Sequence, residues 1–293
     1  MSSTAAAKSE TSADATFPES SDSDPKIVAA LRAAGCVFAE DEARLLAAEA
    51  RTPQELAAMV RRRVAGSPLQ HVLGWAEFCG LRIAVDAGVF VPRPRTELLV
   101  REAAKLLRPS KTPSSQSPHS PLVVDLCCGS GAVGAALAKA VDGIELHAAD
   151  IDPAAVCCAR RNLAAACAKV YEGDLFEPLP DSLRGRISVL IANAPYVPTH
   201  AIGLLPPEAR LHEPLVALDG GADGLDVLRR VTAGAREWLA PGGHLLVESS
   251  DRQVAHVLDA MAASGLAPRV VRCDELEAST VIATRPARDV VRH

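Results

Sequence analysis

Aromatic residues are scarce in this chain. Two tryptophans, two tyrosines and five phenylalanines make up 3% of its 293 residues, although 48% of the residues are hydrophobic. Alanine, leucine and valine must therefore build most of the core. A chain of this length has room for one large α/β domain and a smaller one.

Long apolar runs and an excess of positive charge are missing as well. No stretch approaches the roughly 20 residues that a membrane helix needs, and residues 1–25 contain neither an Arg-rich amphipathic face nor the apolar core of a signal peptide. We therefore expect a cytoplasmic protein without a membrane partner. The net charge of -5 argues against a general nucleic-acid coat, which would be basic, although a local basic patch is compatible with it.

The chain has eight cysteines but no Cys-x-x-Cys pair and no Cys/His spacing typical of a metal site. Four of them stand in two adjacent pairs, Cys127-Cys128 and Cys157-Cys158. Adjacent cysteines rarely bridge each other, so these are interpreted as reduced, small, buried side chains. We expect no bound metal.

Composition divides the chain into segments. Residues 1–24 have the composition of a disordered acidic tail, residues 25–75 are expected to form a helical substrate-recognition domain, and the alternation over 76–92 predicts a β-hairpin connector that breaks at Gly88. The remainder, residues 93–288, is expected to form the main domain. Its Pro- and Ser-rich stretch over 109–121 predicts a flexible loop.

Helix signals are clear in two places ahead of the main domain. In "TPQELAAMVRRRVAG", Thr52 is the expected N-cap, Pro53 the first helical residue and Glu55 the partner in a capping box. The three arginines at 61–63 are interpreted as a solvated face. Thr96 is predicted to cap a further helix that begins at residue 97.

From Leu122 onward, predicted strands alternate with predicted helices. The strands are "LVVDL", "IELHAAD", "KVYEGD", "ISVLIANAP" and "GGHLLVE", and the helices cover about 132–141, 153–168 and 225–239. This alternation predicts an α/β fold with a doubly wound, mostly parallel sheet. Such sheets bind ligands at the carboxyl ends of their strands.

The segment "VVDLCCGSGAVG" passes from strand to helix through Gly129, Gly131 and Gly134. These glycines satisfy the G-x-G-x-x-G pattern and permit a close approach of a ligand to the backbone, although packing of helix on strand explains them equally simply. Asp150 ends the next strand, where a carboxylate can accept hydrogen bonds from both ribose hydroxyls. Asp152 is better explained as the N-cap of the following helix. These features indicate a nucleoside cofactor without deciding between NAD and S-adenosylmethionine.

Two further acids favour S-adenosylmethionine. Asp125 lies four residues ahead of the first glycine, where it would repel a phosphate but suits a cationic amino group. Asp174 closes the third strand, near the expected position of an adenine amino group. S-adenosylmethionine carries an ammonium and a sulfonium group and has no phosphate, so acids at three successive strand ends fit it better than they fit NAD.

The motifs "DLCCGSG", "AADIDPAA", "EGDLFEPL" and "IANAPYVP", in this order, resemble those of the protein-(glutamine-N5) methyltransferases. The resemblance extends to the segments "GSPLQHVLGWAEF", "VFVPRPRTELLV" and "HEPLVALDGGADGLDVLRR". Within this family, the sequence is most similar to the peptide chain release factor glutamine methyltransferases. The resemblance implies a seven-stranded class I methyltransferase sheet, S-adenosyl-L-methionine as cofactor, a monomer, and a release factor carrying a Gly-Gly-Gln loop as partner, with no stable nucleic-acid binding.

Carried onto this sequence, the resemblance assigns two sets of residues. The cofactor set is Asp125, Cys127, Cys128, Gly129, Ser130, Gly131, Asp150, Asp174, Leu175 and Asn193, and the catalytic set is Asn193, Ala194, Pro195 and Tyr196. The chain departs from the family pattern where Cys127 and Cys128 stand in a loop that usually reads closer to GTGSG. It also departs at Ala194, where the motif usually has proline, and at Arg95, where an acid is usual.

The Asn-Ala-Pro-Tyr segment suits methylation of an amide nitrogen, whose lone pair must be localised before it can attack. Two acceptors on its N–H groups stabilise the positive charge that develops. Asn193 can supply a side-chain oxygen, and Ala194 a main-chain carbonyl whose direction is restricted by Pro195. Tyr196 can pack its ring against the amide and the electron-poor methyl group. The alternative is an ordinary Asn-Pro turn at the end of a strand.

Other interpretations stay open at this point. The same two acceptors serve methyltransferases that act on the amino groups of adenine or guanine in DNA or RNA, and a diverged fold that holds the nucleoside without turnover is a third class. Arg93 either guides the substrate or pairs with Glu97. Glu213 and Asp223 either shape the substrate entrance or lie in a solvated loop.

Overall fold

The computed structural model describes residues 24–108 and 120–287. The predicted acidic tail and almost all of the predicted loop over 109–121 therefore lie outside the described residues. The chain divides into two compact units, residues 1–60 and 61–293. No helix among the described residues is both long enough and apolar enough to cross a bilayer.

The first unit is helical. It contains α1 (Pro25–Ala33), α2 (Ala39–Glu49) and the start of α3 (Pro53–Val64), with Leu31 and Leu46 fully buried. The expected cap of α3 is present, because Thr52 Oγ1 accepts a hydrogen bond from the Glu55 amide at 3.1 Å. The returning bond differs by one residue from a capping box: the Glu55 carboxylate accepts from the amide of Arg51 at 2.8 Å.

The arginines at the end of α3 are not a uniform solvated face. Arg61 and Arg62 are exposed, but Arg63 is buried. Its Nη1 lies 2.7 Å from Glu208 Oε1 and 3.2 Å from the Ser67 carbonyl. The expectation was wrong for Arg63 because its partner is 145 residues away in the sequence.

After α4 (Leu69–Leu73), strands β1 (Trp75–Phe78) and β2 (Leu81–Ala84) pair in antiparallel fashion. Cys79 and Gly80 form the two-residue turn, both with positive φ (50° and 69°), as the tight turns of hairpins require. The hairpin thus turns at Gly80 and ends at Ala84, whereas we expected it to turn at Gly88 and to cover 76–92. The apolar alternation continues past it because Val85, Val89 and Val91 are buried without being part of a strand.

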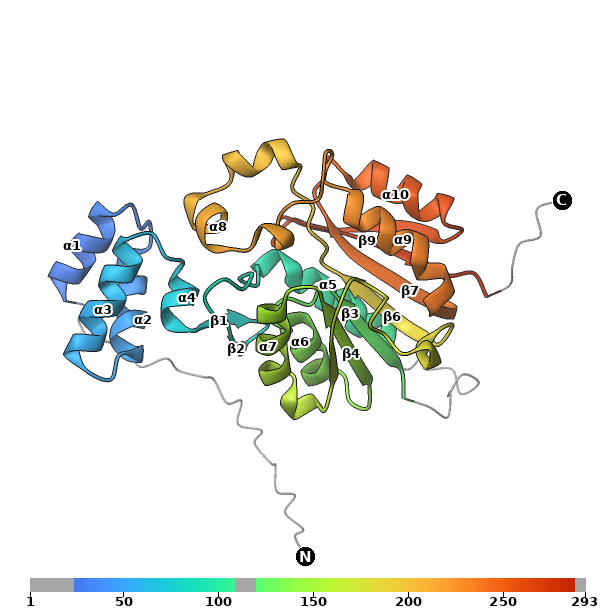
Figure 1. Ribbon diagram of the computed structural model, residues 1–293, viewed down its shortest axis with the longest axis horizontal. Helices are drawn as coiled ribbons and strands as arrows, with labels where there is room; N and C mark the ends of the chain where they lie inside the picture. Colours follow the sequence, from blue (N-terminus) through green and yellow to red (C-terminus); the bar gives the residue numbers. More distant parts are fainter. Residues whose placement is uncertain (1–23, 109–119, 288–293) are drawn as a thin grey trace, which may run out of the picture. The chain divides into compact units, whose positions relative to one another are not determined.

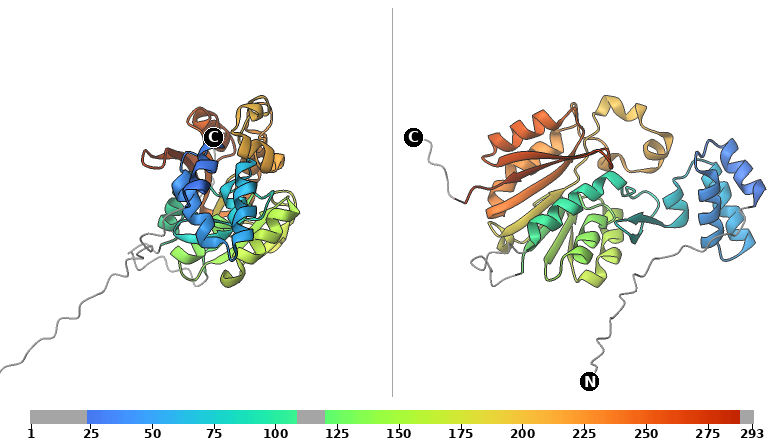
Figure 2. Two further views of the ribbon diagram at one scale, coloured as in Figure 1. Left: turned by 90° about the vertical axis from the view of Figure 1, so that its left-hand side faces the viewer. Right: turned by 180° about the vertical axis from the view of Figure 1, so that it is seen from behind.

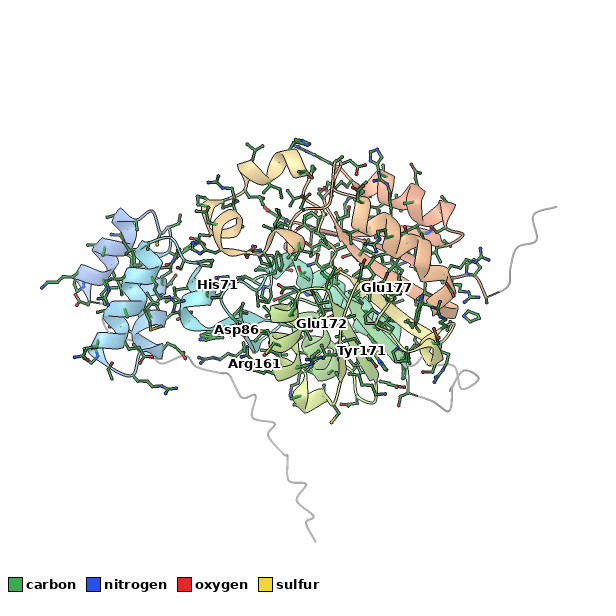
Figure 3. The ribbon with its side chains drawn as sticks, in the orientation of Figure 1. His71, Asp86, Arg161, Tyr171, Glu172 and Glu177 are labelled. Atoms are coloured by element: carbon green, nitrogen blue, oxygen red, sulfur yellow. The ribbon has the colours of Figure 1, made fainter. Side chains whose placement is uncertain are left out.

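The hairpin is attached to the main sheet through α7 (Pro153–Asn162). The Asn162 side chain accepts from the Ala84 amide at 3.0 Å and donates to the Ala84 carbonyl at 2.8 Å. Arg161 pairs with Asp86 just beyond β2, and both side chains are labelled in Figure 3. Asn162 also donates to the Ser130 carbonyl at 2.8 Å, so one side chain links the hairpin to the glycine-containing loop.

The main domain is built on a seven-stranded sheet, which confirms the expected fold class. Its strands are β3 (Leu122–Leu126), β4 (Glu145–Asp150), β5 (Lys169–Glu172), β6 (Ile187–Ala192), β7 (Leu239–Ser249), β8 (Ala267–Cys273) and β9 (Ala278–Thr284). The spatial order is β5-β4-β3-β6-β7-β9-β8, and β9 alone runs antiparallel to its neighbours. The chain reverses its direction of travel across the sheet between β3 and β6, which is the switch point where such folds bind ligands.

Helices cover both faces of this sheet (Figure 1 and Figure 2). On one side lie α5 (Glu97–Leu107), α6 (Ala132–Ala140) and α7, and on the other α9 (Asp226–Trp238) and α10 (Val254–Ala263). The short helix α8 (Pro207–His212) belongs to the long segment between β6 and α9. Side chains of β3 alternate between the two cores: Val123 faces α6, while Val124 faces the α9 side.

Candidate active site

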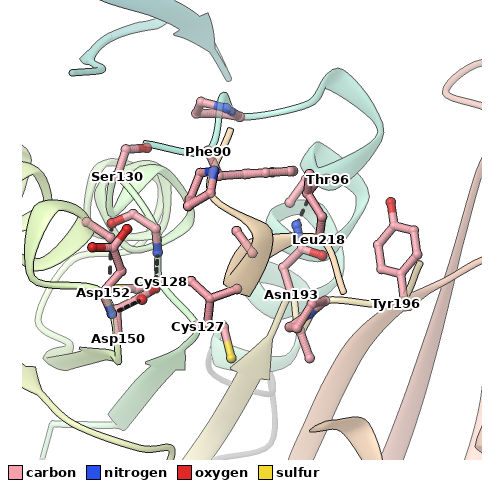
Figure 4. A pocket seen from close by; sticks show the side chains of 18 of the residues that line it. Phe90, Thr96, Cys127, Cys128, Ser130, Asp150, Asp152, Asn193, Tyr196 and Leu218 are labelled. Carbon is pink, nitrogen blue, oxygen red and sulfur yellow. Dashed lines mark hydrogen bonds between the residues drawn. The ribbon is translucent and has the colours of Figure 1, made fainter. Parts of the chain in front are cut away.

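A cavity of about 600 Å³ opens at the carboxyl ends of β3, β4 and β6. This volume is within the usual range for a small-molecule site. Every predicted site residue except Gly131 lines it: Asp125, Cys127, Cys128, Gly129, Ser130, Asp150, Asp174, Leu175, Asn193, Ala194, Pro195 and Tyr196. Figure 4 shows the glycine-containing loop on one side of the cavity and Asn193 with Tyr196 on the other.

Asp150 holds the glycine-containing loop in place. Its Oδ2 accepts from the Gly129 amide at 2.8 Å, and its Oδ1 accepts from the Asp152 amide at 2.9 Å (Figure 4). Each carboxylate oxygen can accept a further hydrogen bond, so the position predicted for ribose contacts is compatible with these bonds. Asp152 caps α7 through the Ala154 amide at 2.9 Å, as expected.

Asp125 is almost fully buried, with 1% of its surface exposed. Its Oδ2 accepts from the Gly134 amide at 3.2 Å. Burial is the main reason why the pKa of Asp125 is raised to about 7, and the nearby charge of Asp150 raises it further. A buried carboxylate at this place is therefore stabilised by a cation and destabilised by a phosphate.

Three alternate residues of the loop have a positive φ: Cys127 (54°), Gly129 (54°) and Gly131 (78°). This conformation is costly for a residue with a side chain, and Cys127 adopts it while lining the cavity. Burial and the neighbouring carboxylates raise the pKa of the Cys127 and Cys128 thiols well above their usual value. Both side chains therefore stay protonated and contribute shape rather than a nucleophile.

Gly131 has a packing role, and the cofactor contact predicted for it stays a prediction. It precedes α6 with a φ of 78°, and a Cβ there would lie 3.1 Å from both the Ala159 Cβ and the Leu163 Cγ. The glycine therefore allows α6 to pack closely on α7, and it does not line the cavity. For Gly131 the packing explanation of the glycine pattern holds.

Asp174 lines the cavity together with the buried Leu175, but its carboxylate is engaged. Asp174 Oδ2 lies 2.6 Å from Arg230 Nη2 of α9. A contact between Asp174 and an adenine amino group would use one of the remaining acceptor positions of this carboxylate, and it stays a prediction. Arg230 had not been expected in the site.

The Asn-Ala-Pro-Tyr segment follows β6 directly, and two of its side chains make hydrogen bonds behind the cavity. Asn193 Nδ2 donates to Thr96 Oγ1 at 3.4 Å, and the Tyr196 hydroxyl donates to Glu248 Oε1 at 3.1 Å. Burial, followed by the charge of Glu248, raises the pKa of the Tyr196 phenol well above its usual value. Tyr196 is therefore a neutral phenol at physiological pH.

Thr96 does not cap α5 with its side chain, contrary to expectation. It ends a short 3₁₀ turn (Pro94–Thr96), and its hydroxyl donates to Glu248 Oε2 at 2.6 Å. The pKa of Glu248 is raised above its usual value because burial outweighs the lowering effects of the Thr96 hydrogen bond and the positive charge of Arg95. Arg95, which stands where the family pattern has an acid, is half exposed with its Nε 3.8 Å from Glu248 Oε1.

The main chain of the segment is held by the loop over residues 218–224. The Val197 amide donates to the Leu218 carbonyl at 3.0 Å, and the Gly220 amide donates to the Val197 carbonyl at 2.8 Å. A Cβ on Gly220 would lie 2.7 Å from the Pro195 carbonyl oxygen, so only glycine fits there. Gln253 Nε2 donates to the Tyr196 carbonyl at 3.0 Å.

Arg93 pairs with Glu213 and not with Glu97. Its Nη2 lies 2.6 Å from both carboxylate oxygens of Glu213, whose side chain is 1% exposed. The Glu97 carboxylate instead accepts from the amide of Cys79 at 3.2 Å. Glu213 thus ties the segment ahead of α5 to the segment that carries α8, whereas Asp223 is exposed and pairs with Arg229.

Sequence reasoning missed Glu248, Gln253 and Arg230 and gave Thr96 the wrong role. A signal for Glu248 was present: it is an acid near the carboxyl end of a strand, as Asp125 and Asp150 are. No local signal marks Gln253 or Arg230, since each acts through a partner at least 56 residues away. Among residues 24–108 and 120–287, no group of three or more potential metal ligands is present.

The sequence is similar to those of known methyltransferases. The family model of the methyltransferase small domain matches residues 96–204. The chain is 40% identical to a release factor glutamine methyltransferase of Geobacter sulfurreducens over 73% of this chain and 72% of that protein. It is 36% identical to the release factor glutamine methyltransferase of Mycolicibacterium smegmatis over 94% of this chain and 96% of that protein.

A third relative is named for a different substrate. The 4-amino-L-phenylalanine/4-methylamino-L-phenylalanine methyltransferase of Streptomyces pristinaespiralis is 36% identical over 70% of this chain and 69% of that protein. Among solved structures, a methyltransferase from Pyrococcus furiosus is similar with a TM-score of 0.52 at 15% identity, over 78% of this chain and 99% of that one. This likeness supports the fold alone.

Proposed function

The chain belongs to the family of release factor glutamine methyltransferases, and from this premise we propose that it transfers a methyl group from S-adenosylmethionine to the side-chain amide nitrogen of a glutamine in a peptide chain release factor. The observation that carries the proposal is the cavity lined by carboxylates at one side and by Asn193 and Ala194 at the other. The first side suits a cationic nucleoside and the second suits a substrate that presents two N–H donors.

The residues present fit S-adenosylmethionine better than a dinucleotide. Asp125 and Asp150 stand on the cofactor side of the cavity, and the loop Cys127–Gly131 contains no basic side chain for a phosphate. Asp125 would hold the ammonium group and Asp150 the ribose hydroxyls. When bound, the cofactor supplies an electrophilic methyl group.

The chain's own residues prepare the amide nitrogen. An amide lone pair is delocalised into its carbonyl, and acceptors on both N–H groups stabilise the charge that appears when it localises. Asn193 Oδ1 and the main-chain carbonyl of Ala194 are these acceptors. The ring of Tyr196, with its hydroxyl fixed on Glu248, lies beside the amide and excludes water. No strong base is required, because a methylated amide nitrogen that carries positive charge is acidic and loses its proton to water.

The proposed substrate is tested by incubating the protein with S-adenosylmethionine, a purified release factor and ribosomal proteins, followed by peptide mass spectrometry. We expect one added methyl group on the glutamine of the Gly-Gly-Gln loop. A short peptide of this loop should react more slowly than the folded factor, because contacts far from the glutamine help to hold the amide in line. We propose that the N-terminal helices supply part of these contacts.

Three other results would each assign a different substrate. A methyl group found only on nucleic acid would overturn the amide chemistry. Methylation of another protein at glutamine would keep the chemistry and reject the release factor. Methylation of a free aromatic amine, the kind of substrate for which the Streptomyces relative is named, would reject a protein substrate altogether.

The raised pKa of Asp125 makes cofactor binding depend on pH. Without ligand, Asp125 holds its proton below about pH 7 because burial disfavours its charge. An ammonium group is stabilised only by the ionised carboxylate, so binding at pH 6 should release up to one proton. Affinity should then rise about tenfold per pH unit up to pH 7. The cofactor amine, with an ordinary pKa of about 8, stays charged over this range.

Calorimetry at pH 6 in two buffers of different ionisation enthalpy counts the released protons. The control is Asp125→Asn, which should bind more weakly at pH 8 and show no pH dependence from this site. Binding at pH 6 without proton release, or an unchanged pH profile in Asp125→Asn, would contradict the assignment.

A further inference from the structure

Behind the reacting end of the cavity, one buried carboxylate accepts hydrogen bonds from two hydroxyl groups. Glu248, near the end of β7, has 4% of its surface exposed. Its Oε2 accepts from the Thr96 hydroxyl at 2.6 Å and its Oε1 accepts from the Tyr196 hydroxyl at 3.1 Å. The shorter distance is that of a strong hydrogen bond from a hydroxyl to a carboxylate oxygen. Burial raises the pKa of Glu248, and the guanidinium of Arg95 at 3.8 Å opposes that rise.

This arrangement fixes the direction of the next hydrogen bond. The Thr96 hydroxyl donates to Glu248 Oε2, and a threonine hydroxyl has a single proton, so that proton is already used. Toward Asn193, Thr96 Oγ1 can then only accept. The Asn193 group at 3.4 Å from it is the amide nitrogen, and the dashed line in Figure 4 marks this bond. The opposite amide orientation would place two oxygen atoms against each other.

We propose that Thr96, held by Glu248, is a positioning residue that orients the Asn193 amide so that its oxygen faces the cavity as the acceptor for the substrate nitrogen. Thr96 and Asn193 both line the cavity, whereas Glu248 lies behind them. Without the Thr96 hydroxyl, the Asn193 side chain can turn its NH₂ group toward the cavity, where it would repel the N–H groups of the substrate. The proposal rests on the proposed function only in naming that substrate as an amide.

The kinetic test compares Thr96→Val, which has the same shape without the hydroxyl, with Thr96→Ser, which keeps it. We expect Thr96→Val to lower kcat at least tenfold with an unchanged Kd for S-adenosylmethionine, and Thr96→Ser to stay within about threefold of the wild type. Thr96→Ala is a second variant without the hydroxyl, for use if valine prevents folding. All rates are measured on whichever acceptor the wild type methylates.

A double-mutant comparison separates positioning from a general structural effect. In an Asn193→Ala background, Thr96→Val should change kcat less than twofold, because the residue through which Thr96 acts is gone. The matched control is Thr232→Val, which removes another buried threonine hydroxyl, one that donates to the Arg229 carbonyl in α9 at 3.0 Å. It should leave kcat unchanged. A full loss from Thr96→Val in the Asn193→Ala background would overturn the proposal, and so would a Thr96→Val enzyme with wild-type kcat.

A spectroscopic measurement tests the inference without any substrate. The side-chain NH₂ signal of Asn193 can be identified in ¹⁵N spectra by its loss in Asn193→Ala. Its hydrogen-bonded proton should shift upfield in Thr96→Val and stay in place in Thr96→Ser and Thr232→Val. An unshifted signal in Thr96→Val would overturn the positioning role, whereas a wild type that methylates no release factor would overturn only the proposed substrate.

Discussion

Replacing Asn193 with alanine should lower kcat for methyl transfer by about 10²–10³ and leave cofactor affinity nearly unchanged. This is the usual scale for losing one preorganised polar group that acts on charge developing in the transition state. The Asn193 side chain stands at the end of β6 with its nitrogen bonded to Thr96, so its oxygen is set before any substrate arrives. Radiolabelled methyl transfer at saturating cofactor gives kcat, and calorimetry gives the Kd.

The neighbouring residue provides the control. Ala194→Pro should be close to neutral, because the proposed acceptor at residue 194 is a main-chain carbonyl and Pro195 already restricts its direction. Full turnover in Asn193→Ala would show that the motif does not act through this side chain. A large loss in Ala194→Pro would show that the amide hydrogen or the side chain of Ala194 matters, and not its carbonyl alone.

The five parallel strands from β3 to β7 could be predicted from the residues because their signal is local, whereas β8 and β9 were implied only by the family resemblance. Strands such as β3, "LVVDL", are short apolar runs, and α7 begins at a capping residue of its own, Asp152. The same local reading failed for the hairpin. Val85, Val89 and Val91 have the spacing of residues on one face of a strand, but they are buried in a segment after β2 that turns at residues 87–88. Periodicity alone does not distinguish the two cases.

The cofactor side of the site could be predicted for a related reason. Parallel strands bring their carboxyl ends to one edge, so acids at the ends of β3 and β4 had to meet there. Asp125 and Asp150 do so. Two further features depend on tertiary packing and could not be predicted. A side chain at Gly131 would crowd Ala159 of α7, and Asp174 forms an ion pair with Arg230 of α9.

The reacting side was predicted only in part, because its supports come from distant segments. Thr96 has the residue type and place of a helix cap, yet its hydroxyl is used by Glu248, 152 residues later. Arg93 has an acid four residues on, but it pairs with Glu213, 120 residues away. In both cases a weak local interaction is replaced by a buried one with a shorter hydrogen bond. Prediction from neighbouring residues in the sequence cannot identify these distant partners.

Asp150→Ala should weaken S-adenosylmethionine binding by about 1.5–3 kcal/mol, or about 10- to 150-fold in Kd, the scale for hydrogen bonds to a charged group. The carboxylate has two uses here. It is the proposed acceptor for ribose hydroxyls, and it fixes the amides of Gly129 and Asp152. Calorimetry measures the loss. At saturating cofactor, kcat should fall much less than the affinity, because Asn193 and Tyr196 are anchored on Thr96 and Glu248.

Asp152→Ala is the matched control for this prediction, since it removes a carboxylate two residues away that also borders the cavity. Asp152 caps α7, so its loss should lower the free energy of unfolding by about 1 kcal/mol and change the Kd no more than about threefold. NAD should bind neither the wild type nor either variant, because Asp125 disfavours a phosphate. Equal losses of affinity in the two variants would mean that loop structure, and not ribose recognition, explains the effect of Asp150. NAD binding by the wild type would reject the cofactor itself.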